Sequence, residues 1–125
     1  MDVIRFKTPI SVLGVGTAVG KKEFDGPLGS KFDIHSDDDR FGQKTWEKSE
    51  AEMVKISYNN ALFDAGIVSG DVGAIFAGDL MNQCTASAYG LSDTNTPYFG
   101  LYGACSTMAE AIMLGALTVS GGNFK

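Results

Sequence analysis

Cys105 is the residue of this sequence whose type and setting best suit chemistry or ligand binding. It follows an apolar stretch that favours a buried strand, and it precedes a stretch that favours a helix. Backbone N–H groups at a helix start stabilise a thiolate or a bound anion, and Gly103 and Ala104 leave room for a ligand. The setting is that of a nucleophile elbow, in which a reactive side chain is exposed on a sharp turn. The alternative is a small buried cysteine that packs beneath the helix.

A cysteine nucleophile needs a base or another proton-handling partner, and the sequence offers few. His35 is the single histidine, and it lies beside the acidic run 37–39, which favours an exposed loop. We therefore do not pair His35 with Cys105, and we expect no self-sufficient cysteine enzyme. The acidic loop lacks the glycine and distal glutamate of a calcium loop, so we expect no metal site. The glycines of 14–20 do not match a dinucleotide fingerprint, and we expect no cofactor.

Polar residues also follow the second expected strand, in the stretch 78–83. Ligands of open α/β sheets bind outside the carboxyl ends of the strands. Asp79 and Asn82, with Gln83, are therefore placed to line a pocket near Cys105. The alternative is that Asp79 or Asn82 caps the next helix, and both interpretations stay open because a capping residue can also face a site. Cys84 is expected in the core.

Alternating strands and helices must position these residues. The stretch 46–65 is the clearest helix, because apolar residues recur at helical spacing and Gly66 can close it. The stretch 21–45 reads as a long polar loop. Strand and helix alternation predicts an α/β fold with a mostly parallel sheet. The expected strands are 10–19, 72–77 and 98–102, and the expected helices are 46–65, 82–91 and 104–119.

Composition narrows the classes of function. The 125 residues carry 10 basic and 15 acidic side chains, a net charge of −5, with no basic run. Binding of nucleic acid through phosphate neutralisation is therefore not expected. No stretch is apolar enough to span a membrane and no signal peptide is evident, so we expect cytoplasmic synthesis. Two cysteines outside any C-x-x-C pair favour free thiols.

Several stretches of this sequence resemble the stage V sporulation protein AD family of spore-forming bacteria. They are 42–48, 77–83 and 100–107, with a further likeness over 23–33. The string Ala-Gly-Asp-Leu-Met-Asn-Gln at 77–83 is the most specific, whereas a cysteine before a helix fits any thiolase or ketoacyl synthase. The likeness extends over nearly the whole chain, from about residue 8 to residue 125.

The resemblance implies a thiolase-like fold, which consists of two similar halves of mixed sheet and helix. Residues 1–125 would form the first, N-terminal half as a single truncated half-domain: a mixed, mostly parallel sheet with flanking helices. The histidines that handle protons in condensing enzymes belong to the second half. The resemblance therefore implies a protein that is not an enzyme. The strand 98–102 would pair across a twofold axis, which implies a homodimer when the protein is full length.

The resemblance also implies a ligand and a setting in the cell. Proteins of this family are associated with dipicolinic acid, and they help to move it, as its calcium chelate, into the spore and out at germination. They act with other proteins of the same operon, peripherally at the spore inner membrane. Cys105 and Ser106 would lie at the ligand pocket, with Asp79 and Asn82 nearby. The alternative function is an acyltransferase of the thiolase and ketoacyl-synthase class that uses Cys105.

Overall fold

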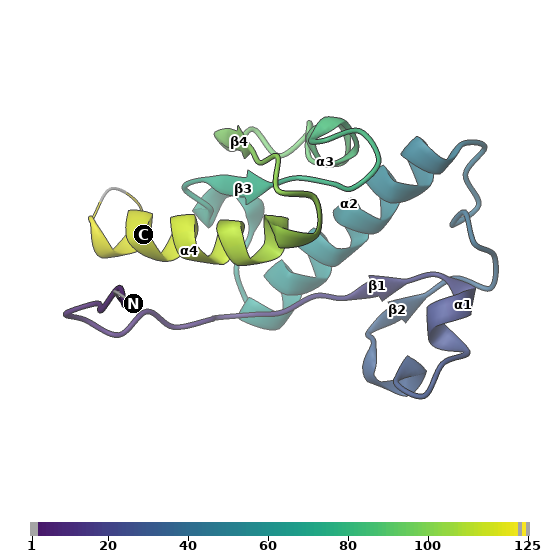
Figure 1. Cartoon of the computed structure of the whole chain (residues 1–125), viewed down its shortest axis with the longest axis horizontal. Coiled ribbons are helices and arrows are strands. Elements are labelled where there is room, and N and C mark those ends of the chain that lie inside the picture. Colours follow the sequence, from purple (N-terminus) through teal and green to yellow (C-terminus); the bar gives the residue numbers. More distant parts are fainter. Residues whose placement is uncertain (1–2, 123, 125) are drawn as a thin grey trace.

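The computed structural model describes residues 3–122 and residue 124 of the chain (Figure 1). Short strands and helices alternate through this part, as the sequence predicts. The strands are β1 (Ala18–Val19), β2 (Ile34–His35), β3 (Ile75–Ala77) and β4 (Tyr98–Gly100). The helices are α1 (Lys21–Phe24), α2 (Trp46–Ala65), α3 (Thr85–Gly90) and α4 (Thr107–Ser120), and 3₁₀ turns cover Gly29–Lys31, Ser69–Asp71 and Ala104–Ser106.

The strands form two separate parallel pairs. β1 pairs with β2, and β3 pairs with β4, so that Ile75 lies opposite Tyr98 and Ala77 opposite Gly100. The α/β class and the parallel pairing are confirmed. The single sheet that the alternation predicts is not seen within the described residues, where no hydrogen-bonded ladder joins the two pairs.

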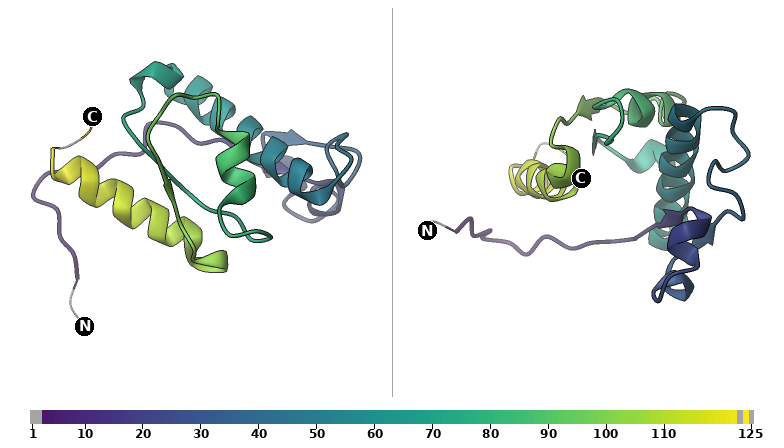
Figure 2. Two further views of the ribbon diagram at one scale, coloured as in Figure 1. Left: turned by 90° about the horizontal axis from the view of Figure 1, so that it is seen from above. Right: turned by 45° about the vertical axis from the view of Figure 1, so that its right-hand side comes forward.

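The first expected strand, 10–19, is mostly absent. Only Ala18 and Val19 are paired, and the stretch before them runs as an extended tail that leaves the body of the molecule (Figure 2). An apolar strand needs a paired neighbouring strand, and within the described residues none pairs with the stretch before Ala18. Gly14 and Gly16 lie against the backbone of α2, but larger apolar side chains of the stretch stay exposed. Val12 is 80% exposed and Leu13 is 73% exposed.

The tail borders a wide apolar groove rather than a packed core. The groove holds about 580 Å³, and its walls come from the tail, from the region of β3 and from α4. Phe76, Ile112 and Ala116 are among the residues that line it. Large apolar side chains of α4 are accordingly exposed: Met108, Ile112, Met113, Leu117 and Val119.

The helix predicted over 46–65 is confirmed at both ends. The Thr45 hydroxyl accepts a hydrogen bond from the N–H of Lys48 at 3.3 Å, which satisfies one free donor of the first turn. Gly66 adopts a left-handed conformation with φ of 68°, and its N–H bonds back to the last turn. α2 packs mainly against α3, where Gly90 approaches the backbone of Ala51 too closely for a Cβ atom.

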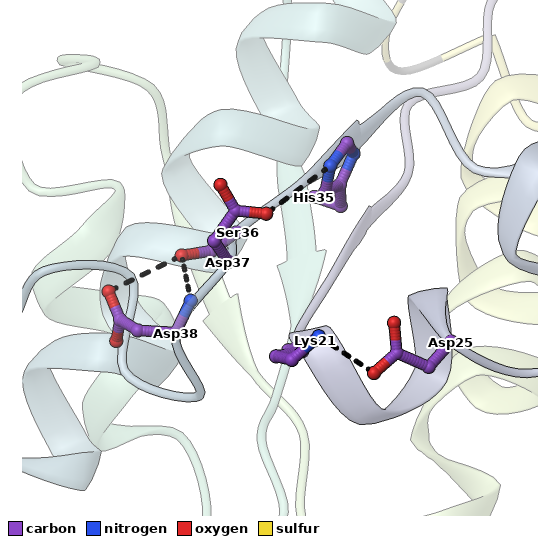
Figure 3. A network of polar contacts seen from close by, with 6 residues as sticks. All are labelled: Lys21, Asp25, His35, Ser36, Asp37 and Asp38. Carbon is purple, nitrogen blue, oxygen red and sulfur yellow. Dashed lines mark hydrogen bonds and ion pairs between the residues drawn. The ribbon is translucent and has the colours of Figure 1, made fainter.

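The stretch 21–45 is not the plain loop that its composition suggests, because it contains α1 and β2. Short-range polar contacts hold it (Figure 3): Lys21 pairs with Asp25 at 2.9 Å, and the Ser36 hydroxyl contacts Asp38. The Asp38 carboxylate accepts the N–H of Arg40 and that of Gly42, and these bonds hold its pKa below the usual value. These contacts give the acidic residues a structural role within the loop.

His35 is exposed, as the sequence predicts. Its ring stacks on Phe24 with centroids 3.5 Å apart, and Nε2 lies 4.0 Å from the Asp37 carboxylate. Among the residues that the structure describes, no three histidine, cysteine, aspartate or glutamate side chains gather as a metal site would require.

Candidate functional site

The carboxyl ends of β3 and β4 lie side by side, and the residues that follow them form the candidate site. The N–H of Leu101 donates to the carbonyl of Ala77 at 2.9 Å, which continues the strand pairing beyond β4. Gly78 lies so close to the Leu101 carbonyl that a Cβ atom there would overlap it. The chain segments after both strands therefore begin in contact, which is the arrangement that the parallel strands predict.

Cys105 lies between β4 and α4, in the 3₁₀ turn Ala104–Ser106. The helix itself begins at Thr107, a few residues later than the sequence suggests. Ala104 has φ of 45°, a conformation that costs an L-residue energy and sharpens the turn. Cys105 is exposed, and it does not pack beneath the helix. The buried alternative is therefore wrong.

A cavity of about 420 Å³ opens beside Cys105. Its walls come from α2, β3, the loop after β3, the 3₁₀ turn and α4, and they are mostly apolar. Four polar side chains interrupt these walls: Glu50, Asp79, Cys105 and Thr107. The complete lining is Glu50, Val54, Phe76, Ala77, Gly78, Asp79, Leu80, Ala104, Cys105, Thr107, Met108 and Ala111.

Asp79 is buried and fully engaged, although its side chain also lines the cavity. One carboxylate oxygen accepts both the N–H of Ser87 at 2.9 Å and the Ser87 hydroxyl at 3.0 Å. The other accepts the N–H of Asn82 at 3.1 Å. The Ser87 hydroxyl also contacts the Tyr98 hydroxyl at 2.7 Å, which links the network to β4. Asp79 thus accepts hydrogen bonds from the first turn of α3 and also lines the cavity. Its position therefore agrees both with capping of α3 and with lining a pocket.

The same network explains why α3 is shorter than expected. The sequence predicts a helix over 82–91, but the structure has one over Thr85–Gly90. Asp79 holds the N–H of Asn82, and Gln83 takes φ of 65°, so the chain turns here before it can coil. Cys84 follows this turn, half-buried, with its sulfur 3.5 Å from the Tyr102 hydroxyl.

Three of the predicted site residues are not among those that line the cavity. Asn82 and Gln83 are exposed on the loop after β3, and Ser106 is exposed on the 3₁₀ turn. The Ser106 hydroxyl donates to the carbonyl of Gly103 at 2.7 Å, so it supports the turn that carries Cys105. The structure brings Cys105 and Asp79 to one cavity, and a binding role for Asn82 and Ser106 stays a prediction.

Glu50 and Thr107 are the polar lining residues that the sequence did not predict. In the sequence Glu50 is one of several acidic residues early in a helix, where the helix dipole favours negative charge. The structure instead turns it toward the loop after β3, where the N–H of Leu80 donates to Glu50 Oε1 at 3.2 Å. Burial raises the pKa of Glu50 above its usual value. Only the packing of α2 on that loop reveals this, so no local signal could have found it.

Comparison with known proteins identifies the family. The family model described as stage V sporulation protein AD matches residues 1–125. The chain belongs to the stage V sporulation protein AD family. It is 38% identical over 120 residues to stage V sporulation protein AD of Bacillus subtilis, a match that covers 96% of this chain. The resemblance inferred from the motifs is confirmed.

The matched region covers 36% of the Bacillus subtilis stage V sporulation protein AD, so this chain spans about a third of that relative's length. The family model and the sequence identity together show that the chain belongs to this sporulation family. None of the helices in the described residues combines the length and the apolar character needed to cross a bilayer.

We predict that Asp79→Ala destabilises the protein. The substitution leaves the buried N–H of Ser87 without its acceptor, a loss that costs about 1–3 kcal/mol, while the Ser87 hydroxyl keeps its contacts with the Cys84 carbonyl and the Tyr98 hydroxyl. Urea denaturation of the full chain measures the change in the free energy of unfolding. Asp37→Ala is the matched control, because that carboxylate is fully exposed and its loss should cost less than about 0.5 kcal/mol. Equal stability of the two variants would contradict the role of this network.

Proposed function

We propose that this chain is a non-catalytic sporulation protein that binds dipicolinic acid in the cavity beside Cys105. The binding would serve uptake of dipicolinic acid into the spore and its release at germination. One observation carries the proposal: the exposed Cys105 and the start of α4 border an open cavity at the carboxyl ends of two parallel strands. Membership of the sporulation family supports the choice of ligand.

The shape and polarity of the cavity suit a small flat aromatic acid. Val54, Phe76 and Met108 contribute apolar walls, against which an aromatic ring can pack. Thr107 and Met108 are the first residues of α4, so the positive end of the helix dipole lies at the cavity and favours a carboxylate.

The charge of the lining favours a neutralised ligand. Glu50 and Asp79 are both acidic, and among the described residues no lysine, arginine or histidine lines this cavity. When both carboxyl groups are ionised, a bare dicarboxylate meets like charge, which weakens binding. The calcium chelate of dipicolinic acid carries less negative charge and suits the lining better.

The position of the single histidine supports a role without catalysis. His35 lies on β2 and stacks on Phe24, and it is not among the residues that line the cavity. Cys105 therefore has no imidazole base within the cavity, whereas nucleophilic thiols are normally activated by one. We also propose, from family membership, that the protein acts with other proteins of its operon, peripherally at the spore inner membrane.

We predict that substitution of Cys105 weakens the binding of dipicolinate. Cys105→Ala removes the sulfur from the cavity wall and should weaken binding about threefold to tenfold, a loss of roughly 1 kcal/mol. Cys105→Trp fills the cavity and should abolish binding. Isothermal titration of the full chain with dipicolinate, with and without calcium, measures both effects.

Cys84→Ala is the matched control, because Cys84 does not line the cavity and its loss should leave the affinity unchanged. Unchanged affinity in both Cys105 variants would rule out binding at this turn. The same protein is incubated with acetyl-CoA and analysed by mass spectrometry. An acetyl group on Cys105 would support the acyltransferase alternative and overturn the non-catalytic proposal.

We further propose that β4 pairs with its own copy in a homodimer of the full-length protein. β4 pairs with β3 on one side, and within the described residues its other edge carries no strand. Unpaired edges invite association with another strand. Sedimentation velocity should find a dimer that Phe99→Lys on β4 dissociates, whereas Tyr89→Lys on α3 leaves it intact. A wild-type monomer would contradict the proposal.

A further inference from the structure

Two buried polar atoms have no hydrogen-bond partner among the described residues, and both belong to side chains of the Cys105 cavity. They are Oε2 of Glu50 and Oγ1 of Thr107. Thr107 is only 8% exposed. A buried polar atom without a partner costs about 1–3 kcal/mol, and folded proteins retain few of them. Their occurrence together at one cavity points to a partner that enters the cavity.

The surroundings fix both side chains. Glu50 lies on α2, and its other carboxyl oxygen is occupied by the N–H of Leu80. Thr107 begins α4, and its methyl group lies against Gly78, where an added Cβ atom would come within 3.0 Å of it. A polar group that occupies the cavity is therefore the available partner for both free atoms.

The surroundings of Glu50 raise its pKa above the usual value. Burial has the largest effect and raises its pKa, and the negative charges of Asp79 and Glu47 raise it further. The N–H groups of Leu80 and Met81 act in the opposite direction. Asp79 and the Cys105 thiol are the other titratable groups that the described residues bring to this cavity, and no basic side chain of these residues lines it. A neutral carboxyl is a hydrogen-bond donor, as is the threonine hydroxyl.

We infer that Glu50 and Thr107 form a donor subsite, in which the Glu50 carboxyl and the Thr107 hydroxyl both donate hydrogen bonds to a carboxylate group of the ligand. The inference rests on the proposed function, because it takes the ligand to be an aromatic carboxylate. It adds a consequence that the proposed function alone does not have. Binding weakens as pH rises, because a deprotonated Glu50 loses its donor and repels the ligand.

The test measures the affinity of the full chain for dipicolinate, without calcium, at about pH 5 and pH 7.5. Wild-type affinity should fall about tenfold between these values, which corresponds to about 1.4 kcal/mol. The Glu50→Gln variant should bind dipicolinate equally at the two pH values, since its amide donates a hydrogen bond at any pH. Thr107→Val should bind about threefold to tenfold more weakly at both. Glu47→Gln, on the same helix but outside the cavity, should keep the wild-type dependence on pH.

The outcomes separate the inference from the proposed function. If wild type binds dipicolinate and Glu50→Gln keeps the wild-type dependence on pH, the donor subsite is wrong and the proposed function stands. Wild-type affinity for Thr107→Val would likewise remove that hydroxyl from the subsite and overturn the inference. If wild type binds dipicolinate at neither pH, with or without calcium, the proposed function fails, and the inference fails with it. If wild type binds only with calcium, the proposed function stands and the donor subsite is wrong.

Discussion

The buried carboxylate of Asp79 is the interaction on which the rest of this site depends. It holds the loop after β3 by accepting hydrogen bonds from both ends of the turn that leads into α3. Through Ser87 and Tyr98 it also ties that turn to β4. These bonds fix the loop that supplies Gly78, Asp79 and Leu80 to the wall of the cavity beside Cys105. The cavity gives the exposed sulfur a setting in which a ligand can lie.

The cavity combines apolar walls with buried polar atoms that have no hydrogen-bond partner in the described part of the chain. Apolar walls alone would accept many small molecules, since the hydrophobic effect has no direction. The free oxygens of Glu50 and Thr107 add direction, because a ligand must present an acceptor to both. When Glu50 is ionised, the acidic lining further disfavours anions whose charge is not offset. These features together define a narrow class of ligand, and they agree with membership of a sporulation family whose ligand is proposed to be dipicolinic acid.

The features that local sequence determines were predictable, and those that need distant contacts were not. The ends of α2 follow from Thr45 and Gly66, which act within one turn of the chain. The place of Cys105 at a strand-to-helix turn was likewise predictable, whereas its exposure was not, because the sequence left the buried alternative open. The unpaired tail before β1 was not predictable, because its apolar pattern cannot show whether a neighbouring strand is present. Glu50 was missed for a related reason, since its burial depends on a loop 30 residues away.

The central claim is that a ligand occupies the cavity against the sulfur of Cys105. The most direct measurement is the rate at which iodoacetamide alkylates each cysteine, read by peptide mass spectrometry with and without saturating dipicolinate. Cys84 serves as the reference within the same molecule, because it lies outside the cavity. The account predicts that dipicolinate slows alkylation of Cys105 and leaves that of Cys84 unchanged. Equal rates at Cys105 with and without the ligand would contradict it.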